Sequence, residues 1–216
     1  MHSFSGFTLR TMATYVFDVG ETLVSENRMW TRHADRLRIP TFTFFSVFGA
    51  LLERGEDHRA VFRHFGVDIA TYLADVDSLN DPNDAMLPVD LYPDVVPTLR
   101  ALTEQGHRVG IAANQPARAQ EAIEGLGLSL DFVGISATWG VSKPSPKFFA
   151  RIIESANVPA HEIIYVGDRL DNDVLPSIAA GMRGVLIRRG PWGELHASSS
   201  QATRASRVID ALSDLV

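Results

Sequence analysis

The sequence predicts an α/β fold of three layers, in which a parallel sheet lies between two layers of helices. Short apolar runs recur along the chain and alternate with amphipathic segments, and several of these runs stop abruptly at Asp, Asn or Gly. Strand, crossover helix and strand in repeated succession favour a parallel sheet covered by helices on both faces. The predicted strands are residues 15–17, 109–113, 132–135, 163–166 and 184–187, the last being the final core strand.

The helices predicted between these strands span residues 94–105, 116–126, 146–156 and 172–180. Ser145 and Pro146 give the third of them a clear start, because serine caps helices and proline fits the first helical position. A Ser-rich loop over residues 197–205 precedes a predicted closing helix over 206–215. Residues 188–193 follow the last core strand and could line a ligand site or close the sheet. We favour the second, because Trp192 is large enough to cover an edge of the sheet.

A helical insertion separates the first strand from the others. Its four amphipathic segments are residues 29–37, 41–54, 56–65 and 69–79. Residues 40–48 also have strand-like composition, but Pro40 and the length of the apolar run favour a helix. We therefore expect a core domain made of residues 14–23 and 91–216, a helical domain over 24–90 and a disordered extension over 1–13.

The composition is that of an ordinary globular protein. The chain has 216 residues, of which 45% are hydrophobic and 21% charged, and its formal net charge is −6. This charge argues against nucleic acid as a partner, since such binding needs a basic face. The lack of cysteine rules out disulfides and thiolate sites and fits a cytoplasmic protein. We expect no membrane partner, because no apolar run has the length of a membrane span.

Polar residues stand at the carboxyl ends of three predicted strands: Asp18, Asn114 and Asp168, with Asp173 shortly after the last. Ligands of open parallel sheets bind at this edge. Two carboxylates 4 Å apart repel each other by about 4 kcal/mol at an effective dielectric of 20, so a divalent cation is expected between them. Magnesium suits the position because it binds a few protein oxygens together with water and phosphate.

The order of these residues, with Lys143 just before a helix, resembles that of the haloacid dehalogenase-like hydrolases. These are mostly magnesium-dependent phosphatases with an aspartate nucleophile, a Rossmann-like core and a cap domain. The resemblance covers residues 15–23 and about 91–190 and implies that 24–90 is the cap. It also implies that Asp18 is the nucleophile and that Asp18, Asp168 and the backbone carbonyl of Gly20 bind Mg²⁺.

Further roles follow from the same resemblance. Asp173 would support the metal site indirectly or through water, with Asp171 as a less favoured substitute. Lys143 would keep Asp18 ionised and balance the charge of the transferred phosphoryl group. Asn114 would bind the substrate phosphate together with Lys143, and Thr22 would lie behind the metal ligands. The expected partner is a small phosphorylated substrate, and the protein could be a monomer or a homodimer.

The sequence departs from the family pattern at two positions. Phosphatases of this family usually have a second aspartate, the general acid and base, two residues after the nucleophile, where this chain has Gly20. They also offer a Ser or Thr hydroxyl where this chain has Ala113. Loss of a general acid costs a factor of about 10²–10⁴ in rate. Glu21, a water molecule, or His33 or Arg36 of the insertion could supply the proton instead.

These departures leave two other functions open. Dehalogenases of the same family also lack the second aspartate and use no metal, although the acidic residues from Asp168 to Asp173 have no purpose in that chemistry. A binding or regulatory protein on a weakened catalytic scaffold is the other alternative, because both Gly20 and Ala113 remove catalytic groups. His58 and His64 do not have the spacing of metal ligands.

Overall fold

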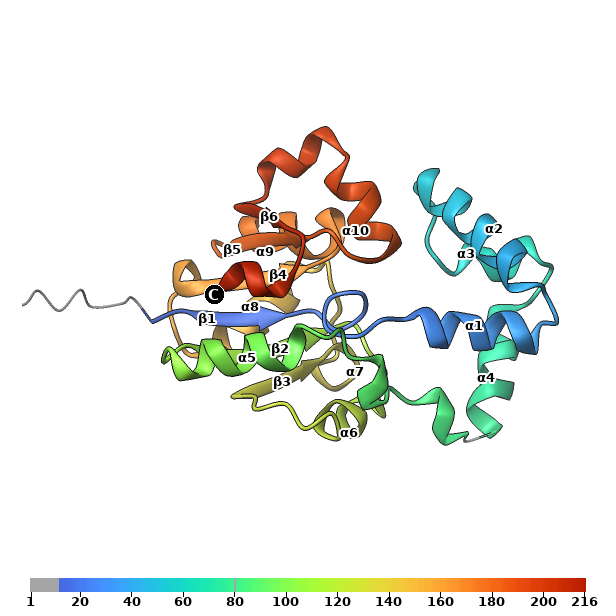
Figure 1. The fold of residues 1–216 in the computed structure, drawn as a ribbon, viewed down its shortest axis with the longest axis horizontal. Helices are drawn as coiled ribbons and strands as arrows, with labels where there is room; N and C mark the ends of the chain where they lie inside the picture. Colours follow the sequence, from blue (N-terminus) through green and yellow to red (C-terminus); the bar gives the residue numbers. More distant parts are fainter. Residues whose placement is uncertain (1–11, 80) are drawn as a thin grey trace, which may run out of the picture.

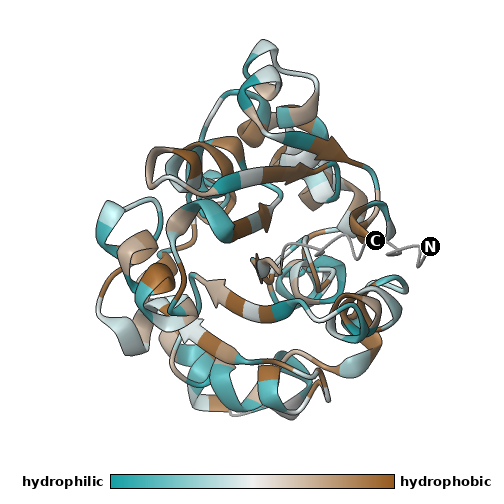
Figure 2. Ribbon diagram, turned by 90° about the vertical axis from the view of Figure 1, so that its left-hand side faces the viewer, coloured by the Kyte–Doolittle hydropathy of each residue, from teal (hydrophilic) through white to brown (hydrophobic). Residues whose placement is uncertain are grey.

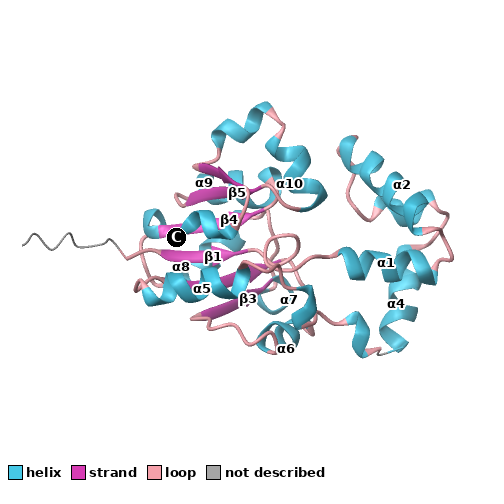
Figure 3. Cartoon of the chain, viewed as in Figure 1, coloured by secondary structure: helices cyan, strands magenta, loops and turns pink. Residues whose placement is uncertain are grey.

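Six parallel strands form the centre of the protein, in the order β3-β2-β1-β4-β5-β6 (Figures 1 and 3). Their bounds are β1 Thr14–Phe17, β2 Arg108–Ala113, β3 Phe132–Ile135, β4 Ile163–Gly167, β5 Arg183–Ile187 and β6 Arg207–Ile209. The computed structural model describes residues 12–79 and 81–216. The predicted fold class, a Rossmann-like α/β core, is confirmed.

The sixth strand corrects the sequence prediction for the end of the chain. Residues 206–215 were expected to form a helix, but Arg207–Ile209 adds to the sheet edge, with Ile187 paired to Ile209. A short 3₁₀ helix, Leu212–Leu215, follows. Because the strand has three residues, it is too short to display the alternation that identifies a strand. The buried Ile209 and Leu212 instead have the three-residue spacing of a helix face.

Helices cover both faces of the sheet. One face packs against α5 (Val95–Glu104) and α6 (Ala119–Glu124), and the other against α8 (Pro146–Ala156). Successive residues of β1 point to opposite faces, so Phe17 joins the first apolar cluster and Val16 the second. Hydrophobic residues accordingly mark the strands in Figure 2. The packed sheet therefore fixes the positions of the residues that follow the carboxyl ends of its strands.

The remaining helices of the core differ more from the prediction. The predicted helix over 172–180 is a π-helical turn, Leu170–Val174, continued by α9, Leu175–Ala179. Two helices were not predicted, α7 (Ser136–Trp139) and α10 (Gly190–Ala197). Among residues 12–79 and 81–216, no helix combines the length and the apolar composition needed to cross a bilayer. Of the predicted extension, residues 1–11 lie outside the described residues, and Ala13 is already buried beside the sheet.

The four predicted helices of the insertion are present, including the one favoured over a strand at residues 40–48. They are α1 Asn27–Arg36, α2 Thr41–Glu53, α3 Ala60–His64 and α4 Ile69–Leu79, and they lie together beyond the carboxyl ends of the strands (Figure 1). Trp30, Phe44, Phe48 and Phe62 form the centre of their apolar cluster. Trp192 packs against this cluster instead of covering a sheet edge, because α10 turns its side chain towards the insertion.

Arginines on α1 attach this helix to the segment that returns to the core. The Nε atom of Arg28 lies 2.7 Å from Asp90 Oδ1, and that of Arg32 lies 2.7 Å from Asp84 Oδ1. Arg36 also pairs with Asp84, at 2.6 Å. The insertion is joined to the core through α1 and through this returning segment. The ion pairs therefore hold these two segments side by side.

A buried histidine makes the stability of the insertion sensitive to pH. Burial, together with the charge of Arg36, lowers the pKa of His33 to about 4, and its Nδ1 lies 2.8 Å from the Tyr72 hydroxyl oxygen. The unfolded chain therefore binds a proton on His33 below about pH 6.5 that the folded protein does not. We expect up to about 3 kcal/mol of stability to be lost through His33 as pH falls from 6.5 to 4.

Urea denaturation of the wild type and of a His33→Asn variant, at pH 7 and at pH 4.5, measures this loss. The variant should lose less stability between the two pH values than the wild type. The exposed His161 supplies a control, since His161→Asn should leave the pH dependence of the wild type intact. An equal pH dependence in all three proteins would contradict the effect of His33 burial.

Candidate active site

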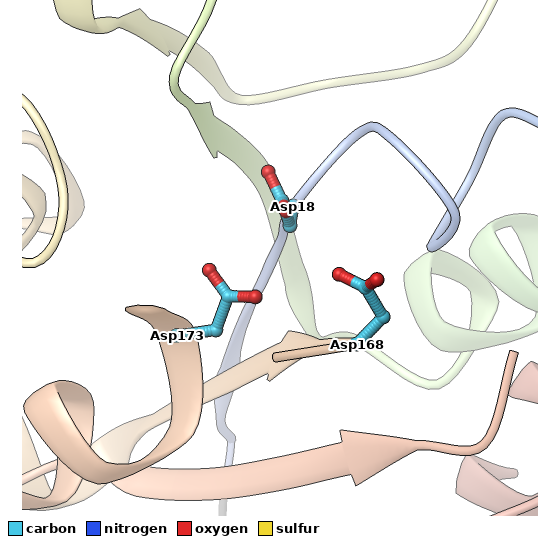
Figure 4. A group of neighbouring side chains, drawn as sticks. All are labelled: Asp18, Asp168 and Asp173. Carbon is cyan, nitrogen blue, oxygen red and sulfur yellow. The ribbon is translucent and has the colours of Figure 1, made fainter. Parts of the chain in front are cut away.

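Two carboxylates come together because β1 and β4 are neighbours in the sheet. Phe17 pairs with Val166, and the next residue, Asp18, donates its backbone N–H to the Val166 carbonyl oxygen at 2.9 Å. Asp168 follows β4 directly, so both aspartates leave the sheet at the same edge (Figure 4). Asp18 is 9% exposed and Asp168 3% exposed. The strand ends thus place both predicted side chains next to each other.

A third carboxylate enters from the π-helical turn after β4. Asp173 is fully buried, and its Oδ2 accepts the backbone N–H of Arg169 at 3.0 Å. A Cβ atom at Gly167 would lie 2.6 Å from the Asp173 carboxyl, so only glycine there allows this close packing. Oxygens of Asp18, Asp168 and Asp173 lie within 4.8 Å of one another. Asp171 instead pairs with the Arg169 guanidinium at 2.7 Å, outside this cluster.

Lys143 is the cation that balances part of this charge. Its Nζ lies 2.8 Å from Asp18 Oδ1 and 2.6 Å from Asp173 Oδ1, and the side chain is 1% exposed. Burial alone would lower the pKa of Lys143, but Asp173 and Asp18 raise it well above the ordinary value. The lysine is therefore charged at neutral pH and bridges the two aspartates.

Asn114 positions the loop that carries this lysine. Its Oδ1 accepts the backbone N–H of Lys143 at 2.8 Å, and its Nδ2 donates to the Lys143 carbonyl oxygen at 3.0 Å. The predicted contact with a substrate phosphate would use the second N–H of Nδ2, which these bonds leave free. Ala113, at the end of β2, is buried and offers no hydroxyl to take that place. In this conformation, the Asn114 amide holds the main chain of Lys143 through both of its polar atoms.

The cluster has more negative charge than Lys143 can balance. Burial and the charges of Asp173 and Asp18 raise the pKa of Asp168 well above its ordinary value. Burial also raises the pKa of Asp173, to about 6, although Lys143 opposes the shift. In the described part of the chain, the Asp168 side chain has no hydrogen bond or ion pair. A nearly buried carboxylate without a partner beside two others fits a divalent cation with oxygen ligands.

The family of this chain follows from a match that covers most of its length. Residues 12–181 match the family model of haloacid dehalogenase-like hydrolases. The chain belongs to this family. The resemblance drawn from the sequence is therefore confirmed, and the site just described lies within the matched residues.

Curated relatives of this family match part of the chain. A glyceraldehyde 3-phosphate phosphatase of Methanopyrus kandleri is 42% identical over 107 residues, which is 48% of this chain and 46% of the relative. A ribulose-1,5-bisphosphate 5-phosphatase of Halopiger xanaduensis is 32% identical over 133 residues, 59% of this chain and 56% of the relative. The chain thus spans about half the length of the curated relatives it matches.

Solved structures of the family share the fold over nearly the whole chain. A HAD phosphatase from Thermococcus onnurineus has a TM-score of 0.61 at 24% identity and covers 94% of this chain and 96% of its own. The L-2-haloacid dehalogenase from Xanthobacter autotrophicus has a TM-score of 0.66 at 18% identity, with 94% and 96% covered. At these identities, the likeness concerns the fold.

Each side chain that the sequence suggested as a general acid has a hydrogen-bond or ion-pair partner outside this cluster. Glu21 accepts a hydrogen bond from the Tyr92 hydroxyl and another from the Glu26 backbone N–H, at 2.7 Å. His33 bonds to Tyr72, and Arg36 pairs with Asp84, both within the insertion. The hydroxyl oxygen of Thr22, which was expected behind the metal ligands, is buried without a hydrogen-bond partner in the described residues.

A further carboxylate, which was not predicted as a site residue, packs against Gly20. Glu26 directly precedes α1, and its Oε1 would be 2.3 Å from a Cβ atom at Gly20. Burial, with the nearby charges of Glu21 and Asp18, raises the pKa of Glu26 to about 7, although a hydrogen bond from Trp30 opposes the shift. An acidic residue just before a helix is so common that its position alone gave no signal.

Proposed function

We propose that this protein is a magnesium-dependent phosphatase that acts on a small phosphorylated metabolite through an aspartyl-phosphate on Asp18. The observation that carries the proposal is the packing of Lys143 and the Asp168 carboxylate against Asp18 at the edge of the sheet. The matched phosphatases and family membership support the same reaction class. We also propose that residues 24–90 act as a cap over a core of 14–23 and 91–216.

In this proposal, Asp18 is the nucleophile. A carboxylate oxygen of Asp18 attacks phosphorus, the bond from phosphorus to the leaving oxygen breaks, and water later cleaves the aspartyl-phosphate. Lys143, held at 2.8 Å from Asp18 Oδ1, keeps the nucleophile ionised and attracts the phosphoryl oxygens. Asn114 keeps the Lys143 main chain in place. Asp173, bonded to Lys143, orients the ammonium group from its other side.

Asp18, Asp168 and the backbone carbonyl of Gly20 would hold Mg²⁺. The ion, when bound, supplies positive charge that offsets the repulsion between phosphate and the carboxylates. Asp168 suits this position because it lacks another partner among the described residues, whereas both oxygens of Asp173 already accept hydrogen bonds. Thr22 would lie next to these ligands without binding the ion itself.

Hydrolysis of para-nitrophenyl phosphate with and without Mg²⁺ tests the proposal. We expect turnover that requires Mg²⁺ and stops in excess chelator. A panel of small phosphorylated metabolites would then identify the preferred substrate. No turnover of any phosphate ester by folded protein with Mg²⁺ would contradict the proposal.

Magnesium should also stabilise the folded protein. At a concentration 100 times the dissociation constant, binding to the folded state alone contributes about 2.7 kcal/mol. Asp168→Asn should remove this effect and, because it relieves repulsion with Asp18 and Asp173, should stabilise the metal-free protein. Thermal melting of both proteins with and without Mg²⁺ measures the two effects. Equal stabilisation of wild type and variant would contradict the assignment of Asp168.

Two further assays distinguish the alternatives to a phosphatase. The lack of a carboxylate at Gly20 keeps a metal-free dehalogenase open as an alternative, and together with Ala113 it keeps a phosphate-binding regulator open. Turnover of a 2-haloacid in excess chelator would identify the dehalogenase. Saturable stabilisation by phosphate without turnover would identify the regulator. The cytoplasm as location, and a monomer or homodimer as assembly, remain part of the proposal.

A further inference from the structure

The space beside Gly20 is filled by the carboxyl group of Glu26. A Cβ atom added to Gly20 would lie 2.3 Å from Glu26 Oε1 and 3.0 Å from its Cδ. These distances are too short for a side chain at position 20 and Glu26 to coexist in this conformation. The glycine therefore makes room for the carboxyl group of a residue six positions later in the same segment.

Several contacts hold Glu26 in this position. Its backbone N–H donates to Glu21 Oε1 at 2.7 Å, and its Oε2 accepts the indole N–H of Trp30 at 3.0 Å. Trp30 is 7% exposed, and its ring centroid lies 4.7 Å from that of Phe48. One oxygen of the carboxyl is thus anchored by a rigid aromatic residue. The other, Oε1, has no hydrogen-bond donor among residues 12–79 and 81–216.

The Glu26 carboxyl lies close enough to the acidic cluster to interact with its charges. Glu26 interacts with the charges of both Asp18 and Asp168. Glu26 stands at the start of the insertion, and Gly20 is two residues after the nucleophile. The Glu26 carboxyl therefore stands at the border of the core and the insertion, where a side chain at position 20 would begin.

We propose that Glu26 is the general acid and base of this site, in place of a carboxylate at position 20. The proposal rests on the phosphatase function proposed above. As Asp18 attacks phosphorus, the departing oxygen takes the proton of the Glu26 carboxyl and leaves as an alcohol. The Glu26 carboxylate then removes a proton from water, which attacks the phosphorus of the aspartyl-phosphate. The bond to Asp18 breaks, inorganic phosphate leaves, and both side chains return to their starting states.

Glu26→Gln tests this role across leaving groups of different acidity. Alkyl phosphates need a proton on the departing oxygen, so we expect their kcat/KM to fall by about 10²–10⁴-fold. Para-nitrophenyl phosphate has a good leaving group, so nitrophenolate should appear in a rapid stoichiometric burst. A slow phase should follow, because water attack still lacks its base. Stabilisation of the variant by Mg²⁺ would show that its site is folded.

A double variant separates this role from a structural one. Gly20→Asp with Glu26→Ala moves the carboxyl to position 20 and removes the clash, so it should recover alkyl phosphate turnover relative to Glu26→Ala alone. Gly20→Ala with Glu26→Ala is the matched control, and it should not recover turnover. Equal rates in these two double variants would show that a carboxyl group at this place does not speed the reaction, which would contradict the role proposed for Glu26.

These experiments distinguish failure of the Glu26 role from failure of the phosphatase function. If the wild type hydrolyses phosphate esters through Asp18 but Glu26→Gln keeps both the alkyl rate and the dependence on the leaving group, the proposal for Glu26 is overturned and the phosphatase function stands. If folded wild type with Mg²⁺ hydrolyses no phosphate ester, both proposals fail.

Discussion

Asp18→Asn should abolish the turnover of every phosphate ester, with a loss on the order of 10⁶-fold in kcat, as for other enzymes that lose their nucleophile. Asparagine has nearly the same shape as aspartate but attacks phosphorus poorly, and it removes a charge that Lys143 contacts at 2.8 Å. The expected loss is therefore chemical and does not require unfolding. Steady-state kinetics of purified wild type and variant, at saturating Mg²⁺, give this ratio.

Two controls make the Asp18 result decisive. Asp18→Ala should show the same loss, which excludes slow conversion of the asparagine back to aspartate as a source of residual activity. Both variants should melt cooperatively, since the apolar residues of β1 that precede position 18 are unchanged. A folded Asp18→Ala protein that keeps a tenth or more of the wild-type rate would show that another residue attacks phosphorus.

Lys143→Met should have the largest effect on stability. The lysine ammonium lies 2.8 Å from Asp18 Oδ1 and 2.6 Å from Asp173 Oδ1 with almost no exposure, so its removal leaves buried carboxylates unbalanced. Breaking a buried ion pair from one side costs about 3–5 kcal/mol. Denaturant unfolding at pH 7 without Mg²⁺ measures the loss. Lys147→Met, at an exposed position four residues later, should change stability by less than about 0.5 kcal/mol.

The deficit of Lys143→Met should shrink in acid. The pKa of Asp173 is already raised to about 6 with the lysine present, mainly by burial. A raised folded-state pKa means that the folded protein gains protons before the unfolded chain does, so stability increases as pH falls from 7 towards 5. Without Lys143 this gain should be larger. A deficit that is constant from pH 7 to pH 5 would contradict the proposed repulsion between the carboxylates.

The sequence was sufficient to predict most of the core because buried parallel strands are continuous apolar runs. Val109 to Ala113 and Ile163 to Val166 have this pattern, and both form strands. Strand β6 was missed because three residues at a sheet edge carry too little pattern, and α10 because Gly190 and Pro191 suggest a loop. The position of Trp192 could not be predicted, since it depends on the insertion, which comes much earlier in the chain.

The site was predictable where strand ends determine it and unpredictable where loops do. Asp18 and Asp168 follow adjacent strands, so the sheet alone brings them together. The orientation of Asn114 depends on the loop that carries Lys143, and no local pattern indicates that its amide faces the Lys143 main chain. Glu26 is the same kind of case, because its packing against Gly20 depends on where the helix after Glu26 lies.

The most direct test of the phosphatase mechanism is to trap the covalent intermediate. Wild-type protein turning over para-nitrophenyl phosphate with Mg²⁺ is quenched and reduced with borohydride, which converts an aspartyl-phosphate to homoserine, and the peptide containing residue 18 is analysed by mass spectrometry. We predict homoserine at Asp18, only when substrate is present. Reduction at a different aspartate, or an unmodified Asp18 during active turnover of wild type and of the slower Glu26→Gln variant, would contradict the mechanism.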